Sequence, residues 1–320
     1  MKKLLSKIML TISLSFAAIG TGFAQQQYQY SQYMLNNLMV NPGAAGSEDY
    51  TDLKVGGRFQ NISFQGAPSS VFASGHTALG KREHGHDDVK QLPYFGVGGF
   101  LQYESTNPIN KLQLYASGAF HLPLSAKFTL SAGISMGFQQ ATVGLSQSDG
   151  YQNTSGTQLT DGSLTTQNSF LPDGSVGLWL YSKTLYAGIS SRQLFNNQSP
   201  SSNIKQIRDY LVTGGYKLKV SPDFDVLPSV LVKFVPGLPV AADVSVRAMY
   251  KNFIWVGATY RHQDAIPILL GVNIQDKYTI GVSYDITTSL LNRFSRGTVE
   301  VLLGYRLGQS KIAKAPAQFY

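Results

Sequence analysis

Apolar and polar residues alternate with a period of two along most of the chain. Residues 128–138 are the clearest case, with Phe, Leu, Ala, Ile, Met and Phe at the even positions and Thr, Ser, Gly, Ser and Gly at the odd ones. Residues 278–286 repeat the pattern with Tyr, Ile, Val, Tyr and Ile. Successive side chains of a strand point to opposite faces, so these segments are predicted strands with one apolar face and one polar or small face.

The whole pattern predicts an all-β, transmembrane antiparallel β-barrel of about 14 strands, an even count typical of bacterial barrels. Several segments exceed the usual length of globular strands, and aromatic residues recur near their ends, as membrane interfaces favour. A soluble β-sandwich, which also alternates, fits these two features less well. The predicted strands are 52–61, 69–79, 94–105, 111–124, 127–141, 173–182, 184–193, 208–220, 223–235, 239–250, 252–262, 266–275, 277–286 and 297–308.

The connections between these segments predict the orientation of the barrel. Short turns at 182–183, 221–222, 251–252 and 276–277 fit the periplasmic end, although the connection 80–92 at that end is long and charged. The long connections 142–172, 194–207 and 287–296 fit extracellular loops, since outer-membrane barrels have short periplasmic turns and longer outer loops. Both chain ends are then expected on the periplasmic side.

The amino-terminal residues are typical of a secretory signal peptide. Lys2, Lys3 and Lys7 precede a short apolar run at 8–19, and Gly22-Phe23-Ala24 provides small residues for cleavage after Ala24. We therefore expect four parts and a location in the cell outer membrane. The parts are a signal peptide (1–24), an N-terminal periplasmic or plug segment (25–51), an outer-membrane β-barrel (52–308) and a periplasmic C-terminal tail (309–320).

Composition removes several function classes. The chain contains no cysteine, which excludes disulfides and cysteine ligation of metals. Its net charge is +8, but no basic stretch interleaved with aromatic residues points to nucleic acid, so outer-membrane lipid is expected as a partner and nucleic acid is not.

Charged residues recur on the predicted inward face of the strands. One interpretation is a selective channel or a docking surface inside the lumen; the other, which we favour, is a network of ion pairs that fills the interior. These residues are Lys54, Arg58, Lys217, Lys219, Lys233, Asp243, Arg247, Arg261, Asp285, Glu300 and Arg306.

Catalytic and metal chemistry find little support. His84 and His86 stand beside two aspartates in the 80–92 connection, where a solvated loop explains them better than a metal site. His76 lies in a strand, and no serine–histidine pair with a supporting acid can be assembled. Gly96 to Gly99 lacks the following helix of a phosphate loop. We expect no enzyme activity, cofactor or metal.

The segment before the first strand is rich in amides and aromatic residues and ends in a turn at Asn41-Pro42. It could fold into the barrel, cap its periplasmic mouth, or bind a partner. Together with the polar loop that follows the strand 184–193, it supplies the candidate partner-binding residues. These are Tyr30, Tyr33, Asn36, Asn41, Pro42, Phe195 and Asn196.

The run from Tyr33-Met34-Leu35-Asn36 to Asn41-Pro42-Gly43-Ala44-Ala45-Gly46 resembles the PorP/SprF family of the type IX secretion system of Bacteroidota, with Gly43 in place of the usual Ala. The resemblance implies an outer-membrane barrel needed for protein secretion or for surface attachment of cargo such as gliding-motility adhesins. It also implies two partners, the C-terminal domain of a secreted adhesin and the periplasmic ring components. The residues alone leave a second function open, a hydrophobic-solute or porin-like transporter.

Overall fold

The structure of the chain is a computed structural model. It describes residues 29–62, 66–81, 92–107, 109–143, 167–195, 207–289 and 296–308. The predicted signal peptide, the His84 and His86 pair, Asn196 and the C-terminal tail lie outside these residues.

Antiparallel strands make up almost all of the described chain, and nearly every strand pairs with the strands next to it in sequence. The last strand returns to pair with the first, Thr51 opposite Leu307, which closes the sheet. The strands are β1 (Thr51–Phe59), β2 (Ser69–Leu79), β3 (Tyr94–Thr106), β4 (Ile109–Pro123), β5 (Thr129–Val143), β6 (Gln167–Tyr181), β7 (Leu185–Arg192), β8 (Asp209–Tyr216), β9 (Leu218–Ser221), β10 (Phe224–Phe234), β11 (Ala241–Tyr250), β12 (Ile254–Arg261), β13 (Ala265–Ile274), β14 (Tyr278–Thr287) and β15 (Thr298–Leu307).

The short strand β9 continues β8 after a break at Lys217, because both pair with β10. Counted as one strand, they make a closed barrel of 14 antiparallel strands, which confirms the predicted fold class. The predicted strand 208–220 covers both pieces.

The outer face of the barrel is apolar and the inner face is polar, as the alternation predicts. In β14 the exposed residues Tyr278, Ile280, Val282, Tyr284 and Ile286 alternate with buried ones. Outward-facing aromatic residues gather near both ends of the strands, at the levels expected for two membrane interfaces. We call the end of the barrel at Thr51, which the short turns predict to face the periplasm, the periplasmic end, and the opposite end the outer end. The aromatic group near the periplasmic end includes Tyr216, Phe224, Tyr250, Phe253 and Tyr278, and the group near the outer end includes Phe59, Tyr210, Phe234, Tyr260 and Tyr284. Among the described residues, no helix has both the length and the apolar character needed to cross a membrane.

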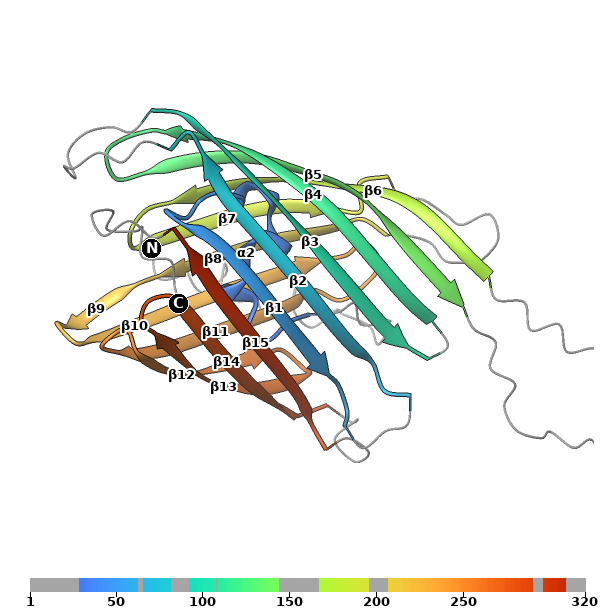
Figure 1. Cartoon of the computed structure of the whole chain (residues 1–320). Coiled ribbons are helices and arrows are strands. Elements are labelled where there is room, and N and C mark those ends of the chain that lie inside the picture. The colour runs from blue at the N-terminus through green and yellow to red at the C-terminus, as the bar shows by residue number, and fades with distance from the viewer. Residues whose placement is uncertain are drawn as a thin grey trace, which may run out of the picture.

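A folded segment of the same chain lies inside the barrel (Figure 1). It contains three short turns of helix, η1 (Tyr33–Leu35), α2 (Asn37–Val40) and η2 (Pro42–Ala44). Asn41 caps η2 by accepting a hydrogen bond from the Gly43 amide, and Pro42 starts that turn, where its missing N–H costs nothing. We call residues 29–50 the plug. Its aromatic and aliphatic side chains form a buried cluster with inward-facing residues of the wall.

Candidate functional site

The outer part of the plug is bound by charged side chains of the barrel wall. The Ser31 amide donates to Oε2 of Glu300 at 2.8 Å, and its hydroxyl donates to Asp285 Oδ2 at 2.7 Å. The Gln32 amide donates to Oε1 of Glu300 at 3.0 Å. Arg58 and Arg261 both donate to the Ser31 hydroxyl oxygen, at 2.9 and 3.1 Å. The plug backbone thus completes a polar cluster that belongs to four strands, β1, β12, β14 and β15.

The two arginines of this cluster form ion pairs with its three carboxylates. Arg58 forms ion pairs with Asp285 at 2.8 Å and with Glu300 at 3.1 Å, and Arg261 pairs with Asp243 at 3.2 Å and with Asp285 at 3.3 Å. All five side chains are buried. Removing one partner from a buried network leaves an uncompensated charge, which is far more costly than breaking an exposed pair. The charged groups that bind the plug are therefore also the groups that form ion pairs with each other inside the barrel.

The middle of the plug is bound by hydroxyl groups. The Tyr33 hydroxyl donates to Ser229 at 3.2 Å, and Ser245 donates to the Tyr33 oxygen at 3.4 Å. Burial raises the pKa of Tyr33 to about 12, so this phenol stays protonated and able to donate. The Asn36 amide donates to Ser74 at 2.9 Å.

The part of the plug nearer the periplasmic end is bound through the Asn41 side chain and through backbone carbonyls. The Asn41 side chain donates to the carbonyls of Leu178 and Ile189, at 2.9 and 3.0 Å, which ties β6 and β7 to the plug. Wall side chains satisfy three plug carbonyls that would otherwise be buried without a donor. Ser190 donates to Val40 at 2.7 Å, Ser131 to Gly43 at 2.8 Å, and His121 contacts the Ala45 oxygen through Nε2 at 2.7 Å.

Glycines let the plug and the wall approach each other closely. A Cβ atom on Gly96 of β3 would lie 1.8 Å from the Ala45 oxygen, and one on Gly133 of β5 would lie 2.4 Å from the Gly43 nitrogen. Gly46 has a φ of +74°, which other residues rarely adopt, and a Cβ there would lie 2.5 Å from the Gly96 Cα. The small residues of the Asn-Pro-Gly-Ala-Ala-Gly run therefore match small residues of the wall.

A titratable cluster closes the periplasmic end of the plug. Glu48, Asp52 and His76 are buried, with ligand atoms within 4.8 Å of one another. A metal on Nε2 of His76 would require the ring proton on Nδ1, but Nδ1 accepts a hydrogen bond from the Gly46 amide at 3.1 Å. The histidine therefore carries its proton on Nε2, 3.4 Å from Asp52, whose carboxylate also pairs with Lys54. The arrangement is an ion-pair cluster rather than a metal site.

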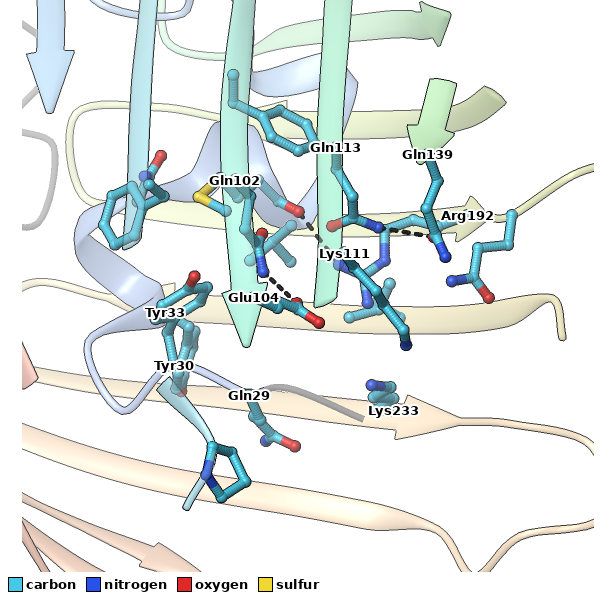
Figure 2. A pocket seen from close by; sticks show the side chains of 18 of the residues that line it. Gln29, Tyr30, Tyr33, Gln102, Glu104, Lys111, Gln113, Gln139, Arg192 and Lys233 are labelled. Carbon is cyan, nitrogen blue, oxygen red and sulfur yellow. Dashed lines mark hydrogen bonds between the residues drawn. The ribbon is translucent and has the colours of Figure 1, made fainter. Parts of the chain in front are cut away.

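Above the plug, a cavity of about 700 Å³ fills the outer half of the lumen. We call it the vestibule. Figure 2 shows its polar wall, where Gln102 donates to Glu104 and Gln113 donates to Gln139. Lys111, Arg192 and Lys233 also line it. Arg192 and Lys233 share Asp209, at 2.5 and 3.8 Å, and Arg192 also donates to the Met39 oxygen of the plug at 3.4 Å. The apolar part of the lining includes Tyr30, Tyr33, Phe72, Phe100, Leu211 and Leu231.

The structure places most of the predicted lumen charges inside the barrel. Arg58, Lys233, Asp243, Arg247, Arg261, Asp285, Glu300 and Arg306 are buried there. Lys54 pairs with Asp52, Lys217 pairs with Asp225 at 3.0 Å, and Arg247 lies over the Trp255 ring at 5.4 Å. Lys219, on β9, is exposed. The predicted set of lumen charges does not include Arg192 and Asp209, although both occupy inward positions of predicted strands.

The candidate partner-binding residues divide into two groups. Tyr30, Tyr33, Asn36, Asn41 and Pro42 lie together in the lumen and contact the barrel, so their visible role is intramolecular. Tyr30 lies beside the outer ends of the strands, where its hydroxyl donates to Ser70 at 3.2 Å. This position is inside the barrel rather than on the periplasmic side. Phe195, just beyond β7, is 47% exposed.

Comparison with solved structures gives outer-membrane barrels of low sequence identity. "CymD monoaromatic hydrocarbon channel" has 11% identity and a TM-score of 0.50, with 92% of this chain and 96% of that chain covered. The toluene transporter TbuX of Ralstonia pickettii has 11% identity, 88% and 94% coverage and a TM-score of 0.47. Omp33 of Acinetobacter baumannii has 9% identity, 82% and 100% coverage and a TM-score of 0.48. At 11% identity, the match to CymD shows that the two proteins share a fold and no more than that.

No curated protein matches the sequence. A family model, "Type IX secretion system membrane protein PorP/SprF", matches residues 22–305 and so includes both the plug and the barrel. The matched family and the barrel fold place the protein in the outer membrane. The chain belongs to the PorP/SprF family of type IX secretion system membrane proteins.

Proposed function

We propose that this protein is a docking barrel of the type IX secretion system. Its lumen is closed by its own plug, and its outer face holds the C-terminal domain of a secreted cell-surface protein, such as a gliding adhesin. The periplasmic face would contact the ring components of the machinery. In this proposal residues 1–24 are removed as a signal peptide, residues 52–308 form the barrel and residues 309–320 form a periplasmic tail.

The observation that carries the proposal is the attachment of the plug to strands on all sides of the barrel. Ser31 is bound from β12, β14, β15 and β1, Tyr33 from β10 and β11, and Asn41 from β6 and β7. Releasing the plug would expose buried charges and carbonyls that now satisfy one another. A lumen filled in this way is poorly suited to diffusion and leaves the two faces of the barrel as its working surfaces.

The vestibule and the outer loops are the surfaces that we assign to the secreted protein. Loops on a rigid scaffold provide variable recognition, and the vestibule is lined by both amide groups and apolar side chains, a mixture that suits a polypeptide better than a simple ion. Phe195, at the rim beyond β7, is the candidate anchor among the described loop residues.

Transport of a hydrophobic solute is the second candidate function. The apolar lining of the vestibule, with Phe72, Phe100, Leu211 and Leu231, favours it. This function requires a route past the plug or through the wall, and it predicts uptake or conductance by the isolated barrel.

Removal of residues 147–165, in the connection between β5 and β6, tests the docking proposal in native cells. We expect the large surface protein to appear in the medium while the barrel keeps the gel mobility of its folded form. A matched variant with a substitution in a periplasmic turn, Lys127→Ala, should leave the surface protein attached. Normal attachment in the loop deletion would reject this loop as the docking surface. Normal secretion and attachment in a strain without the barrel would reject the proposed function.

A further inference from the structure

The plug runs through the barrel in one direction, from its outer end to its periplasmic end. Tyr30 contacts Ser70, at the outer end of β2, and Ser31 contacts Asp285 and Glu300, near the outer ends of β14 and β15. Further along the chain, Gly46 contacts His76 at the periplasmic end of β2. The chain then enters β1 at Thr51, on the periplasmic rim. Gln29, the first described residue, is therefore at the outer end of the plug.

The distance from Gln29 to the periplasmic rim exceeds the reach of the chain that precedes it in the mature protein. Arg58 of β1 binds Ser31 and lies seven residue positions along the strand from Thr51 at the rim. At about 3.3 Å per residue this is about 23 Å along the strand, or about 18 Å along the axis of a barrel with a strand tilt of about 40°. After cleavage behind Ala24, residues 25–28 reach at most about 14 Å when fully extended. The plug itself also fills the lumen between Gln29 and the periplasmic rim.

On the outer side, space is available for these residues. Gln29 lines both the vestibule and a smaller neighbouring cavity of about 140 Å³. The preceding residues are Gln25, Gln26, Gln27 and Tyr28. Glutamine amides donate and accept hydrogen bonds, so they are chemically matched to a wall that carries Gln60, Gln102, Gln113 and Gln139.

We infer that the amino terminus created by signal-peptide removal faces the cell exterior, with residues 25–28 seated in the vestibule. This reverses the expectation that an even-stranded barrel leaves both of its chain ends in the periplasm. The mature terminus then forms part of the outer surface of the protein, where an incoming partner meets it before it meets the plug. The inference rests on cleavage after Ala24 and on the direction of the plug, and it does not require that a secreted protein docks.

The absence of cysteine makes a direct test possible, because any introduced thiol is unique. Gln27→Cys would be treated in intact cells with a maleimide that cannot cross the outer membrane. His262→Cys, in the exposed outer turn after β12, is the positive control, and Lys127→Cys, in the exposed periplasmic turn after β4, is the negative control. We expect Gln27→Cys to be labelled in intact cells, as His262→Cys is. Labelling only after permeabilisation, as for Lys127→Cys, would overturn the inference.

A second variant is needed if the vestibule shields the introduced thiol from the maleimide. A peptide epitope inserted between residues 26 and 27 should bind antibody on intact cells, whereas binding only after permeabilisation would overturn the inference. The intact mass of the purified protein checks the premise. A mature chain that keeps residues 1–24 would also overturn it, because the additional length would allow a return to the periplasm. Gel mobility before and after heating shows that each variant is a folded barrel.

Discussion

The amide of Ser31 donates a 2.8 Å hydrogen bond to the carboxylate of Glu300, across 269 residues of sequence. The bond joins the first described turn of the plug to the last strand of the barrel. The same carboxylate pairs with Arg58 of the first strand, so the point where the barrel closes is also the point where the plug is attached. Closure of the sheet and filling of the lumen therefore depend on the same buried group.

Loss of Arg58 should destabilise the barrel strongly. Arg58→Ala removes the positive charge that pairs with the buried carboxylates of Asp285 and Glu300. We therefore expect the free energy of unfolding to fall by about 3–5 kcal/mol. The matched control is Lys251→Ala, because Lys251 and Asp223 form an ion pair at 3.8 Å whose side chains are 56% and 58% exposed. That change should cost less than about 1 kcal/mol. Urea unfolding in detergent measures both, and similar losses in the two variants would contradict a structural role for the buried network.

Asn41 should tolerate a charge less well than truncation. Asn41→Ala removes two donors to the wall and the acceptor of the Gly43 amide, and we expect it to cost about 2–4 kcal/mol, the sum of several lost buried hydrogen bonds. Asn41→Asp keeps the shape but places a carboxylate against the carbonyls of Leu178 and Ile189. We expect Asn41→Asp to lose more stability than Asn41→Ala in the same unfolding assay. The opposite order would show that the amide donors are unimportant.

Close approach at Gly96 should make the plug sensitive to a single methyl group. Gly96→Ala puts a Cβ 1.8 Å from the Ala45 oxygen, so the plug must move, whereas Gly118→Ala meets nothing within 4 Å. We expect protease cleavage within residues 36–48 to increase in Gly96→Ala and to stay at the wild-type level in Gly118→Ala. Gly43→Ala is an intermediate case, because its Cβ would meet the Trp179 Cβ at 3.0 Å, and a small shift should accommodate it. Equal protection of the plug in the Gly96 and Gly118 variants would refute the close contact.

The stability of the folded protein should fall as pH rises toward the alkaline range. Burial, reinforced by the neighbouring Asp52, raises the pKa of Glu48 to about 8. Between the ordinary glutamate pKa and about 8, the folded state holds a proton that the unfolded chain has released, so the unfolding free energy decreases as pH rises through this window. We expect Glu48→Gln to flatten the decrease between pH 5 and pH 8, and Asp223→Asn, at an exposed site, to leave it unchanged. A decrease of wild-type size in Glu48→Gln would assign it to another group.

The strands could be predicted from sequence because their pattern is local. Alternation in β5 and β14 fixes which side chains face lipid, and it also predicts that Arg58, Asp285 and Glu300 face the lumen. Which of these charges meet could not be predicted, since Arg58 and Asp285 are 227 residues apart and only the closed register brings them together.

The position of the plug could not be predicted from the sequence for a similar reason. Residues 29–50 have no periodic pattern, and their binding groups are mostly backbone amides and carbonyls, which every sequence has. The wall residues that meet them, such as Ser131, Ser190 and Gly133, look like ordinary inward positions of strands. The Asn-Pro-Gly-Ala-Ala-Gly run predicts a tight turn with small residues, but only the structure shows that the wall glycines at 96 and 133 require it.

Conductance in planar lipid bilayers tests the central claim, that the lumen is closed by the plug, most directly. The purified wild-type barrel should insert without producing steady ion conductance, while Gly96→Ala, as the variant with a displaced plug, should open measurable channels at the same protein concentration. Gly118→Ala should behave as the wild type does. Steady, ohmic conductance by the wild-type protein would contradict the plugged barrel and would favour the transporter.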